Sequence, residues 1–307
     1  MGLIAMKLIS IQKSYQRKFE RQKAIREIIY DASGHCVHIG KLSPGCFGCF
    51  APNSSNCNFC SGTKCNLNCV YCNSNKREKD FSAIEQLKNK ALLYKKELSK
   101  DFKPTRISFS GGGEPLLYID VIRKHMEILR DIERRTGNKP WYYLYTNGIL
   151  ANSKVLAQLK ALGFAEIRFH LGATNFSKEV YKNLKKAVHY LKVVTVETPA
   201  WVPHRKKLFA MLPIIEDIGV KHLNIGEIEI NKHNYKRISK VMPRGEIYQC
   251  FETHLYDEGL VYDVIEEVIR KKYSYSVLDC NCFVKSMQRS PAKNTIYENI
   301  AELCAKY

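Results

Sequence analysis

Residues 106–115 read RISFSGGGEP, a short strand-like run that ends in three glycines and an acidic residue. Four more apolar runs follow along the chain, and charged stretches with helical spacing separate them. The runs are WYYLYTNG (141–148), EIRFHLG (166–172), KVVTVETPA (192–200) and HLNIGEIEI (222–230). Because strands that alternate with helices form parallel sheets with right-handed crossovers, this pattern predicts an α/β fold.

The number of repeats predicts the architecture more closely. One short strand is expected before Cys65, and helices are expected at 82–99, 120–135, 153–161, 177–190 and 205–218. Six strand–helix units do not fill an eight-fold barrel, so we expect a partial (β/α)6 barrel with cysteine-rich N- and C-terminal extensions. The expected domains are an N-terminal basic helix with a cysteine-rich extension (1–61), the barrel (62–231) and a C-terminal extension that contributes further cysteines (232–307).

The chain is strongly basic. Its 307 residues suit one main domain, and 49 Lys and Arg against 30 Asp and Glu give a formal charge of +19. Such a surplus attracts nucleic acid or acidic peptides, although a solvated surface without a partner is an equal alternative. Residues 13–29 predict a basic amphipathic helix whose apolar positions include Phe19, Ile25 and Ile28.

Nothing in the sequence indicates a membrane segment. No apolar run approaches the roughly 18 residues that span a bilayer, and MGLIAMKLIS is interrupted too soon by Lys7 to be a signal peptide. We therefore expect a cytoplasmic protein. In that compartment twelve cysteines, most of them in short-spaced pairs, favour metal ligation over disulfides.

The central cysteine motif is CNLNCVYC at residues 65–72. The thiolates of Cys65, Cys69 and Cys72 can bind three irons of a [4Fe–4S] cubane. No cysteine follows closely, so the fourth iron is open to another ligand, which favours a catalytic cluster over an electron carrier. Taken alone, such a triplet could also be a zinc site that lacks one ligand.

The cysteine spacing, with Tyr71 directly before the last cysteine, resembles the signature of the radical S-adenosylmethionine (SAM) superfamily. In that superfamily the amino and carboxylate groups of the methionine moiety chelate the open iron. Gly112-Gly113-Glu114-Pro115 resembles the family's GGE(P) motif, which receives the methionine ammonium. Glycines there let backbone carbonyls approach the ligand, and Glu114 supplies negative charge. Thr146-Asn147-Gly148 resembles the strand end that faces the ribose.

The resemblance covers about residues 62–231 and implies a SAM site at the carboxyl ends of the strands. Arg168 is our candidate for the methionine carboxylate, because a fork of donors suits that group. Arg168 and His170 alternate along one strand, and Glu227 and Glu229 along another. Each of these four could instead form a buried ion pair or a strand-end hydrogen bond. The residues expected to bind SAM are Tyr71, Gly112, Gly113, Glu114, Thr146, Asn147 and Arg168.

Other cysteines indicate a second metal site. Cys46, Cys49, Cys57 and Cys60 precede the triplet and would suffice for zinc or a complete cluster. However, KLSPGCFGC and LDCNCFVK resemble the start and end of a poorly characterised group of archaeal radical SAM proteins. This resemblance implies that Cys46, Cys49, Cys280 and Cys282 bind one auxiliary [4Fe–4S] cluster. The extra pair, Cys57 and Cys60, departs from that pattern and leaves the ligand set open.

The resemblance implies an enzyme that cleaves SAM reductively to a 5′-deoxyadenosyl radical, with ferredoxin or flavodoxin as electron donor. The radical then abstracts hydrogen from a substrate. A peptide or protein is the first choice of substrate, because auxiliary clusters often accompany peptide modification. An RNA, whose bases could stack on Trp201, Tyr235 or Tyr273, is the second. A non-catalytic zinc or Fe–S protein that binds nucleic acid is the remaining alternative.

Overall fold

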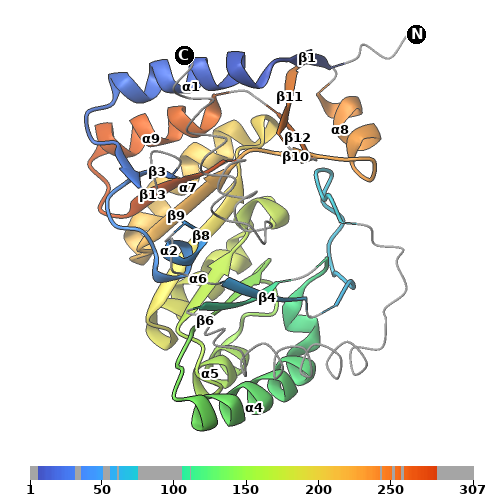
Figure 1. Ribbon diagram of the computed structural model, residues 1–307, viewed down its shortest axis with the longest axis vertical. Helices are drawn as coiled ribbons and strands as arrows, with labels where there is room; N and C mark the ends of the chain where they lie inside the picture. The colour runs from blue at the N-terminus through green and yellow to red at the C-terminus, as the bar shows by residue number, and fades with distance from the viewer. Residues whose placement is uncertain are drawn as a thin grey trace. The chain divides into compact units, whose positions relative to one another are not determined.

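The computed structural model describes residues 6–31, 36–50, 56–60, 62–74, 106–110, 112–242, 244–250, 253–256 and 259–281. The chain divides into two compact units (Figure 1). The middle unit draws on segments 54–68 and 74–195, and the terminal unit on segments 1–53, 69–73 and 196–307. The helix expected at 82–99 lies outside the described residues.

The middle unit is built on a parallel sheet with the strand order β7-β6-β5-β4. Helices follow its strands, and α5 packs against α6. A further strand, β8, runs from this unit into the terminal unit. The elements are β4 Asn56–Cys60, β5 Arg106–Ser110, α4 Ile119–Thr136, β6 Trp141–Thr146, α5 Ser153–Ala161, β7 Glu166–Phe169, α6 Lys178–Tyr190 and β8 Val193–Pro199, with short 3-10 turns at Pro115–Tyr118 and Leu171–Thr174.

The helices of this unit begin and end at residues suited to those positions. The side chains of Asn152 and Ser177 cap α5 and α6 by accepting hydrogen bonds from Val155 N and Val180 N. Helix α4 ends at Gly137, whose φ of 69° lies in the left-handed region. These caps satisfy backbone groups that the ends of an isolated helix leave without partners.

Alternation along the strands gives this sheet two different faces. One face is apolar and fully buried, and Phe109 of β5 packs against His125 of α4 and against Phe164. The apolar residues of this face are Ile107, Phe109, Tyr142, Leu144, Ile167 and Phe169. The opposite face is polar and aromatic, with Ser108, Tyr143, Tyr145, Glu166 and Arg168.

The terminal unit contains two sheets. In the larger, β9 runs parallel to β13, and the order continues through antiparallel β3 to β2. In the smaller, the order is β1-β11-β12-β10. Helix α9 packs against α1 and α7. The elements are β1 Lys7–Ile9, α1 Ile11–Ala24, β2 Ile29–Asp31, β3 Cys36–Ile39, α2 Pro44–Phe50, α7 Arg205–Ile218, β9 His222–Gly226, β10 Glu229–Ile230, α8 Tyr235–Val241, β11 Glu246–Cys250, β12 Thr253–Tyr256, α9 Leu260–Lys271 and β13 Ser276–Cys280, with a 3-10 turn at Val202–His204.

Helix α1 corrects one sequence expectation. It ends at Ala24, and Phe19 is 48% exposed rather than buried. The buried positions are Ser14, Lys18 and Gln22, which lie four residues apart on one face. Lys18 forms an ion pair with the carboxylate of Glu227, so the polar stripe packs inward. The prediction for Phe19 was wrong because hydrogen-bonding partners elsewhere in the unit decide which face is buried.

The expected fold class is confirmed: the protein is a mixed α/β structure with parallel strands. The six strands expected from the sequence occur as β4 to β9, and α5 and α7 have the expected bounds. The domain boundaries at residues 61 and 231, and the cysteine-rich extensions, stay predictions. Among the described residues, no helix combines the length and apolar character needed to cross a membrane.

Candidate SAM and cluster site

The carboxylate of Glu114 joins the loops that follow β5 and β6. Its Oε1 accepts hydrogen bonds from Thr146 Oγ1 at 2.6 Å and Leu116 N at 3.1 Å, and Oε2 accepts from Asn147 N at 2.7 Å. The side chain is only 2% exposed. This burial raises the pKa of Glu114, whereas the three hydrogen bonds favour the charged form and oppose the rise. The carboxylate of Glu114 therefore holds the GGEP loop and the TNG loop together.

The first part of the cysteine loop is attached to the same element. Glu114 N donates to Lys64 O at 2.8 Å, and Asn147 Nδ2 donates to Asn66 Oδ1 at 2.7 Å. A Cβ on Gly113 would lie 2.0 Å from Lys64 O, so only glycine permits this approach. Cys65, between the two tethered residues, is therefore held next to both expected SAM-binding loops.

The second part of the cysteine loop is anchored within the terminal unit. Tyr71 is buried, and its ring meets Trp201 edge-on at a centroid distance of 5.5 Å. Three side chains then donate to three successive carbonyls of the loop. These bonds run from Asn234 to Tyr71 O (3.0 Å), from Arg237 to Cys72 O (2.6 Å) and from Asn231 to Asn73 O (2.8 Å).

The sequence reasoning missed these three donors. Asparagines at 231 and 234, directly before a helix, are a turn and cap signal, because Asn side chains bond nearby backbone. That signal marks the start of α8 but does not reveal a partner more than 150 residues away in the chain.

The cysteines fit a cluster by their chemistry. Cys65, Cys69 and Cys72 are partly exposed thiols on a loop whose backbone is fixed by hydrogen bonds. Within the described ranges, no three His, Cys, Asp or Glu side chains are grouped to bind a single metal ion. A cubane does not require such a group, since each cysteine binds a different iron. Their assignment as ligands stays a prediction.

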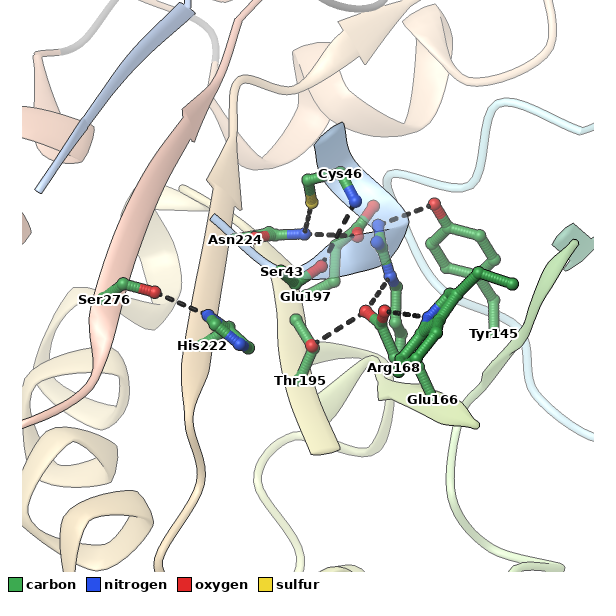
Figure 2. A network of polar contacts seen from close by, with 11 residues as sticks. Ser43, Cys46, Tyr145, Glu166, Arg168, Thr195, Glu197, His222, Asn224 and Ser276 are labelled. Atoms are coloured by element: carbon green, nitrogen blue, oxygen red, sulfur yellow. Dashed lines mark hydrogen bonds and ion pairs between the residues drawn. The ribbon is translucent and has the colours of Figure 1, made fainter. Parts of the chain in front are cut away.

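Arg168 lies in a buried ion pair on the polar face of the middle unit. Its Nε donates to Glu166 Oε1 at 2.8 Å, and Nη1 donates to Tyr145 Oη at 3.0 Å (Figure 2). The guanidinium also lies over the ring of Tyr143, 4.4 Å from its centroid. Arg168 thus forms the buried ion pair that the sequence left open as an alternative to ligand binding. A role of Arg168 at the methionine carboxylate stays a prediction.

Glu166 is the centre of this network. It is fully buried, and it also accepts hydrogen bonds from Thr195 Oγ1 at 3.0 Å and Trp141 Nε1 at 3.1 Å. Interiors of α/β barrels are usually filled by branched apolar residues. Here the polar side chains of this face are instead held by hydrogen bonds to one another.

Glu227 likewise forms an ion pair. Its carboxylate binds Lys18 and accepts from Tyr248 Oη at 2.5 Å. Both partners are buried within the terminal unit. Glu227 therefore forms a buried ion pair, which was the alternative to ligand binding that the sequence left open, and this pair packs α1 against the rest of the terminal unit.

Among the other expected ligands, the side chains of Cys46 and Cys280 are described, whereas those of Cys49, Cys57, Cys60 and Cys282 lie outside the described residues. Cys46 is 2% exposed, and its Sγ accepts a hydrogen bond from Asn224 Nδ2 at 3.1 Å (Figure 2). Because Asn224 pairs with Leu278 and Gly226 pairs with Cys280, Asn224 and Cys280 occupy the same face of β9 and β13. Cys46 and Cys280 therefore lie over one sheet face.

Within the middle unit, the loops after β5 and β6 contact the start of the cysteine loop at Lys64 and Asn66, at the strand ends where α/β barrels usually bind their ligands. Residues 59–196 match the family model of the Radical SAM superfamily. An uncharacterised protein of Methanocaldococcus jannaschii is 30% identical over 43% of this chain and 38% of its own length. A probable GTP 3′,8-cyclase of Methanococcus maripaludis is 28% identical over 59% of this chain and 66% of its own length.

Solved structures agree on the fold. The enzyme anSMEcpe with bound AdoMet has 17% identity and a TM-score of 0.51, over 74% of this chain and 61% of its own. Streptococcus suis SuiB bound to the precursor peptide SuiA has 10% identity and a TM-score of 0.51, over 75% and 50%. The chain thus spans less than two thirds of these relatives. The match to the Radical SAM superfamily model, over residues 59–196, favours an enzyme over the non-catalytic alternative.

Proposed function

We propose that this protein is a radical SAM enzyme that modifies a peptide or protein. The observation that carries the proposal is the Glu114 junction, which ties the GGEP loop to the TNG loop and, through Lys64, to the cysteine loop. In this proposal Cys65, Cys69 and Cys72 hold a [4Fe–4S] cluster. The bound cluster supplies the electron that splits SAM into methionine and a 5′-deoxyadenosyl radical, which takes a hydrogen atom from the substrate and becomes 5′-deoxyadenosine.

The chain's own residues bind and orient the cofactor. Gly112 and Gly113 bring backbone carbonyls to the methionine ammonium, and Glu114 fixes Thr146 and Asn147 at the ribose. Arg168, held by Glu166, presents a cation for the methionine carboxylate. Tyr71, packed on Trp201, keeps the cysteine loop in place and excludes water beside it.

An auxiliary [4Fe–4S] cluster on Cys46, Cys49, Cys280 and Cys282 is part of the proposal. Two observations support it: Cys46 and Cys280 lie over the same face of β9 and β13, and Asn224 donates to the Cys46 sulfur. Asn224 also donates to Glu197 Oε2 at 3.0 Å, which fixes its NH2 group rather than its oxygen toward the sulfur. A sulfur that must accept a hydrogen bond is stabilised as thiolate, the form that binds iron.

A peptide substrate is favoured over RNA, because several charges of the basic helix α1 are already paired with carboxylates. In α1, the charges of Arg17, Lys18 and Arg21 are paired with carboxylates of the terminal unit. Trp201 is buried against Tyr71, which removes it from base stacking. The similar structures SuiB and anSMEcpe have been solved with peptides, and both support this choice. Electron supply by ferredoxin or flavodoxin and a cytoplasmic location belong to the same proposal.

The experiment is an assay of anaerobically purified, dithionite-reduced protein with SAM. Wild type is expected to release 5′-deoxyadenosine, whereas Cys65→Ala, Cys69→Ala and Cys72→Ala each lose about four irons and all activity. Cys304→Ala, outside every expected site, serves as the control. A colourless protein that contains zinc and releases no 5′-deoxyadenosine contradicts the proposal.

The substrate class is tested separately. Binding of an acidic leader peptide, labelled tRNA and GTP is compared at two salt concentrations, because charge-driven binding weakens as screening increases. Sequence-dependent peptide binding supports the proposal. Steeply salt-dependent tRNA binding without peptide binding indicates the RNA alternative, and turnover of GTP alone indicates a small-molecule substrate.

A further inference from the structure

Arg237 of α8 carries a hydrogen-bond donor that the described structure does not satisfy. Its Nη2 donates to Cys72 O at 2.6 Å, while its Nε is buried and has no hydrogen-bond partner among the described residues. We propose that Arg237 is a positioning residue of the cluster site, which fixes the Cys72 peptide and donates Nε–H to a sulfur of the cluster. This inference rests on the proposed function, since it requires a cluster on Cys72.

The geometry of the guanidinium sets the direction of the unsatisfied donor. Nε and Nη2 lie on one edge of a planar group, and their N–H bonds point outward side by side. Because Nη2 reaches the carbonyl of Cys72, Nε–H faces the space beside the same residue. A buried donor without an acceptor is costly, so the loaded protein is expected to supply an acceptor there.

The rest of the segment holds Arg237 in this position. Asn234 is fully buried and donates to Tyr71 O and Glu229 O, at 3.0 and 2.8 Å. Its Oδ1 accepts from Asn231 N at 2.9 Å, and Asn231 in turn donates to Asn73 O. The loop carbonyls on both sides of Cys72 are thus fixed by neighbours of Arg237. All three donors lie beyond residues 59–196, the part that matches the superfamily model.

A sulfur of the cluster is the acceptor that this position favours. Cys72 is one of the three proposed ligands, so a cluster held by its thiolate would bring sulfur acceptors close to the Cys72 peptide that Arg237 already contacts. A cluster gains negative charge on reduction, and both a nearby cation and a hydrogen bond to sulfur stabilise that reduced form. Arg237 is therefore expected to raise the reduction potential of the SAM-binding cluster.

The test compares Arg237→Gln, Arg237→Lys and the control Lys236→Gln, an exposed neighbour in the same helix. The readouts are iron content and the midpoint potential of the cluster from EPR-monitored titration, each without and with SAM. Arg237→Gln is expected to keep its iron and to shift the midpoint to more negative values without SAM. Arg237→Lys, which keeps the charge and loses the fork, is expected to give a smaller shift, and Lys236→Gln none.

Two results overturn the inference. One is a wild-type midpoint in both Arg237 variants. The other is a shift that appears only when SAM is bound, which assigns the donor to the carboxylate of SAM. Failure of the proposed function is distinguishable, because Cys72→Ala then keeps the full iron content of wild type. If Arg237→Gln does not fold, the midpoint of Arg237→Lys decides the question.

Discussion

Thr146 Oγ1 donates a 2.6 Å hydrogen bond to Oε1 of Glu114, across the ends of two neighbouring strands. Together with the bonds from Leu116 N and Asn147 N, this contact engages both carboxylate oxygens with groups of the chain itself. Glu114 therefore organises the loops that surround the proposed SAM site. Any contact with the methionine ammonium is additional to that structural role.

Replacement of Glu114 by alanine is expected to weaken SAM binding and to destabilise the protein. Each buried donor left without an acceptor costs about 1–3 kcal/mol, and the TNG loop loses its attachment. Iron content is expected to stay at the wild-type level, because no proposed cluster ligand is removed. Equilibrium dialysis with labelled SAM and denaturant unfolding measure the two effects.

Thr146→Val is the matched control for Glu114→Ala. It removes the Thr146 hydroxyl bond and leaves the two backbone bonds to Glu114, so its effect on SAM affinity is expected to be smaller. Equal losses in the two variants would show that the hydroxyl, and not the carboxylate junction, determines the binding of SAM.

Variants of the buried ion pair between Glu166 and Arg168 are expected to separate protein stability from SAM affinity. Glu166→Ala leaves Arg168 as a buried charge without its carboxylate, which typically costs about 3–5 kcal/mol. Arg168→Lys keeps the charge but loses the planar fork between Glu166 and Tyr145, so SAM affinity is expected to fall even where the fold survives. Arg134→Gln, at a pair with 72% and 48% exposed side chains, is expected to change stability by less than about 1 kcal/mol. SAM affinity unchanged in folded Arg168→Lys contradicts a role at the methionine carboxylate.

The arrangement of strands was predictable, because it depends on local patterns. RISFS is apolar at every second position, WYYLYT is a continuous aromatic and apolar run, and charged stretches with helical spacing separate the strand-like runs. These signals act within a few residues, and they located β5 to β9, whereas β4 was expected only as a short strand before Cys65. The glycines of GGEP were expected to admit a ligand, whereas the close approach that Gly113 permits in the structure is to Lys64 O, a contact that the local sequence does not reveal.

The hydrogen-bond partners of the polar residues of α1 were not predictable, because they lie far away in the sequence. Lys18, Gln22 and Ser14 look like the solvent face of a basic helix, yet they are its buried face. Tyr248 and Tyr262, more than 200 residues away, accept the bonds that make this burial possible. Arg168 could not be separated from a ligand-binding arginine for a different reason: Glu166, two positions earlier on the same face of β7, pairs with it as a ligand carboxylate would.

The buried ion pair on α1 leads to a prediction about the free energy of unfolding. Lys18→Met removes the cation paired with Glu227 and leaves a buried carboxylate without a counter-charge from Lys18, so it is expected to lower stability by about 3–5 kcal/mol. The double variant Lys18→Met with Glu227→Gln removes both charges and is expected to recover part of this loss. Phe19→Ser, at an exposed position of the same helix, is the control. Thermal unfolding is measured for wild type, Lys18→Met, Glu227→Gln, the double variant and the control. The ion-pair account is contradicted if the double variant is as unstable as the sum of the two single variants.

The last prediction concerns the contact between Asn224 and Cys46. If Cys46 is an auxiliary ligand, Cys46→Ala is expected to lower the iron content from about eight to about four per chain, with the radical-generating cluster still visible by EPR. Asn224→Leu removes the donor to Sγ and leaves Glu197 without this partner, so it is expected to lower the occupancy of the auxiliary cluster alone. Ser276→Ala, which breaks the bond to His222 on the same sheet face, is the control and is expected to keep full iron. Full iron content in Cys46→Ala, with SAM cleavage intact, identifies Cys46 as a buried structural thiol and removes the auxiliary site from this face of the sheet.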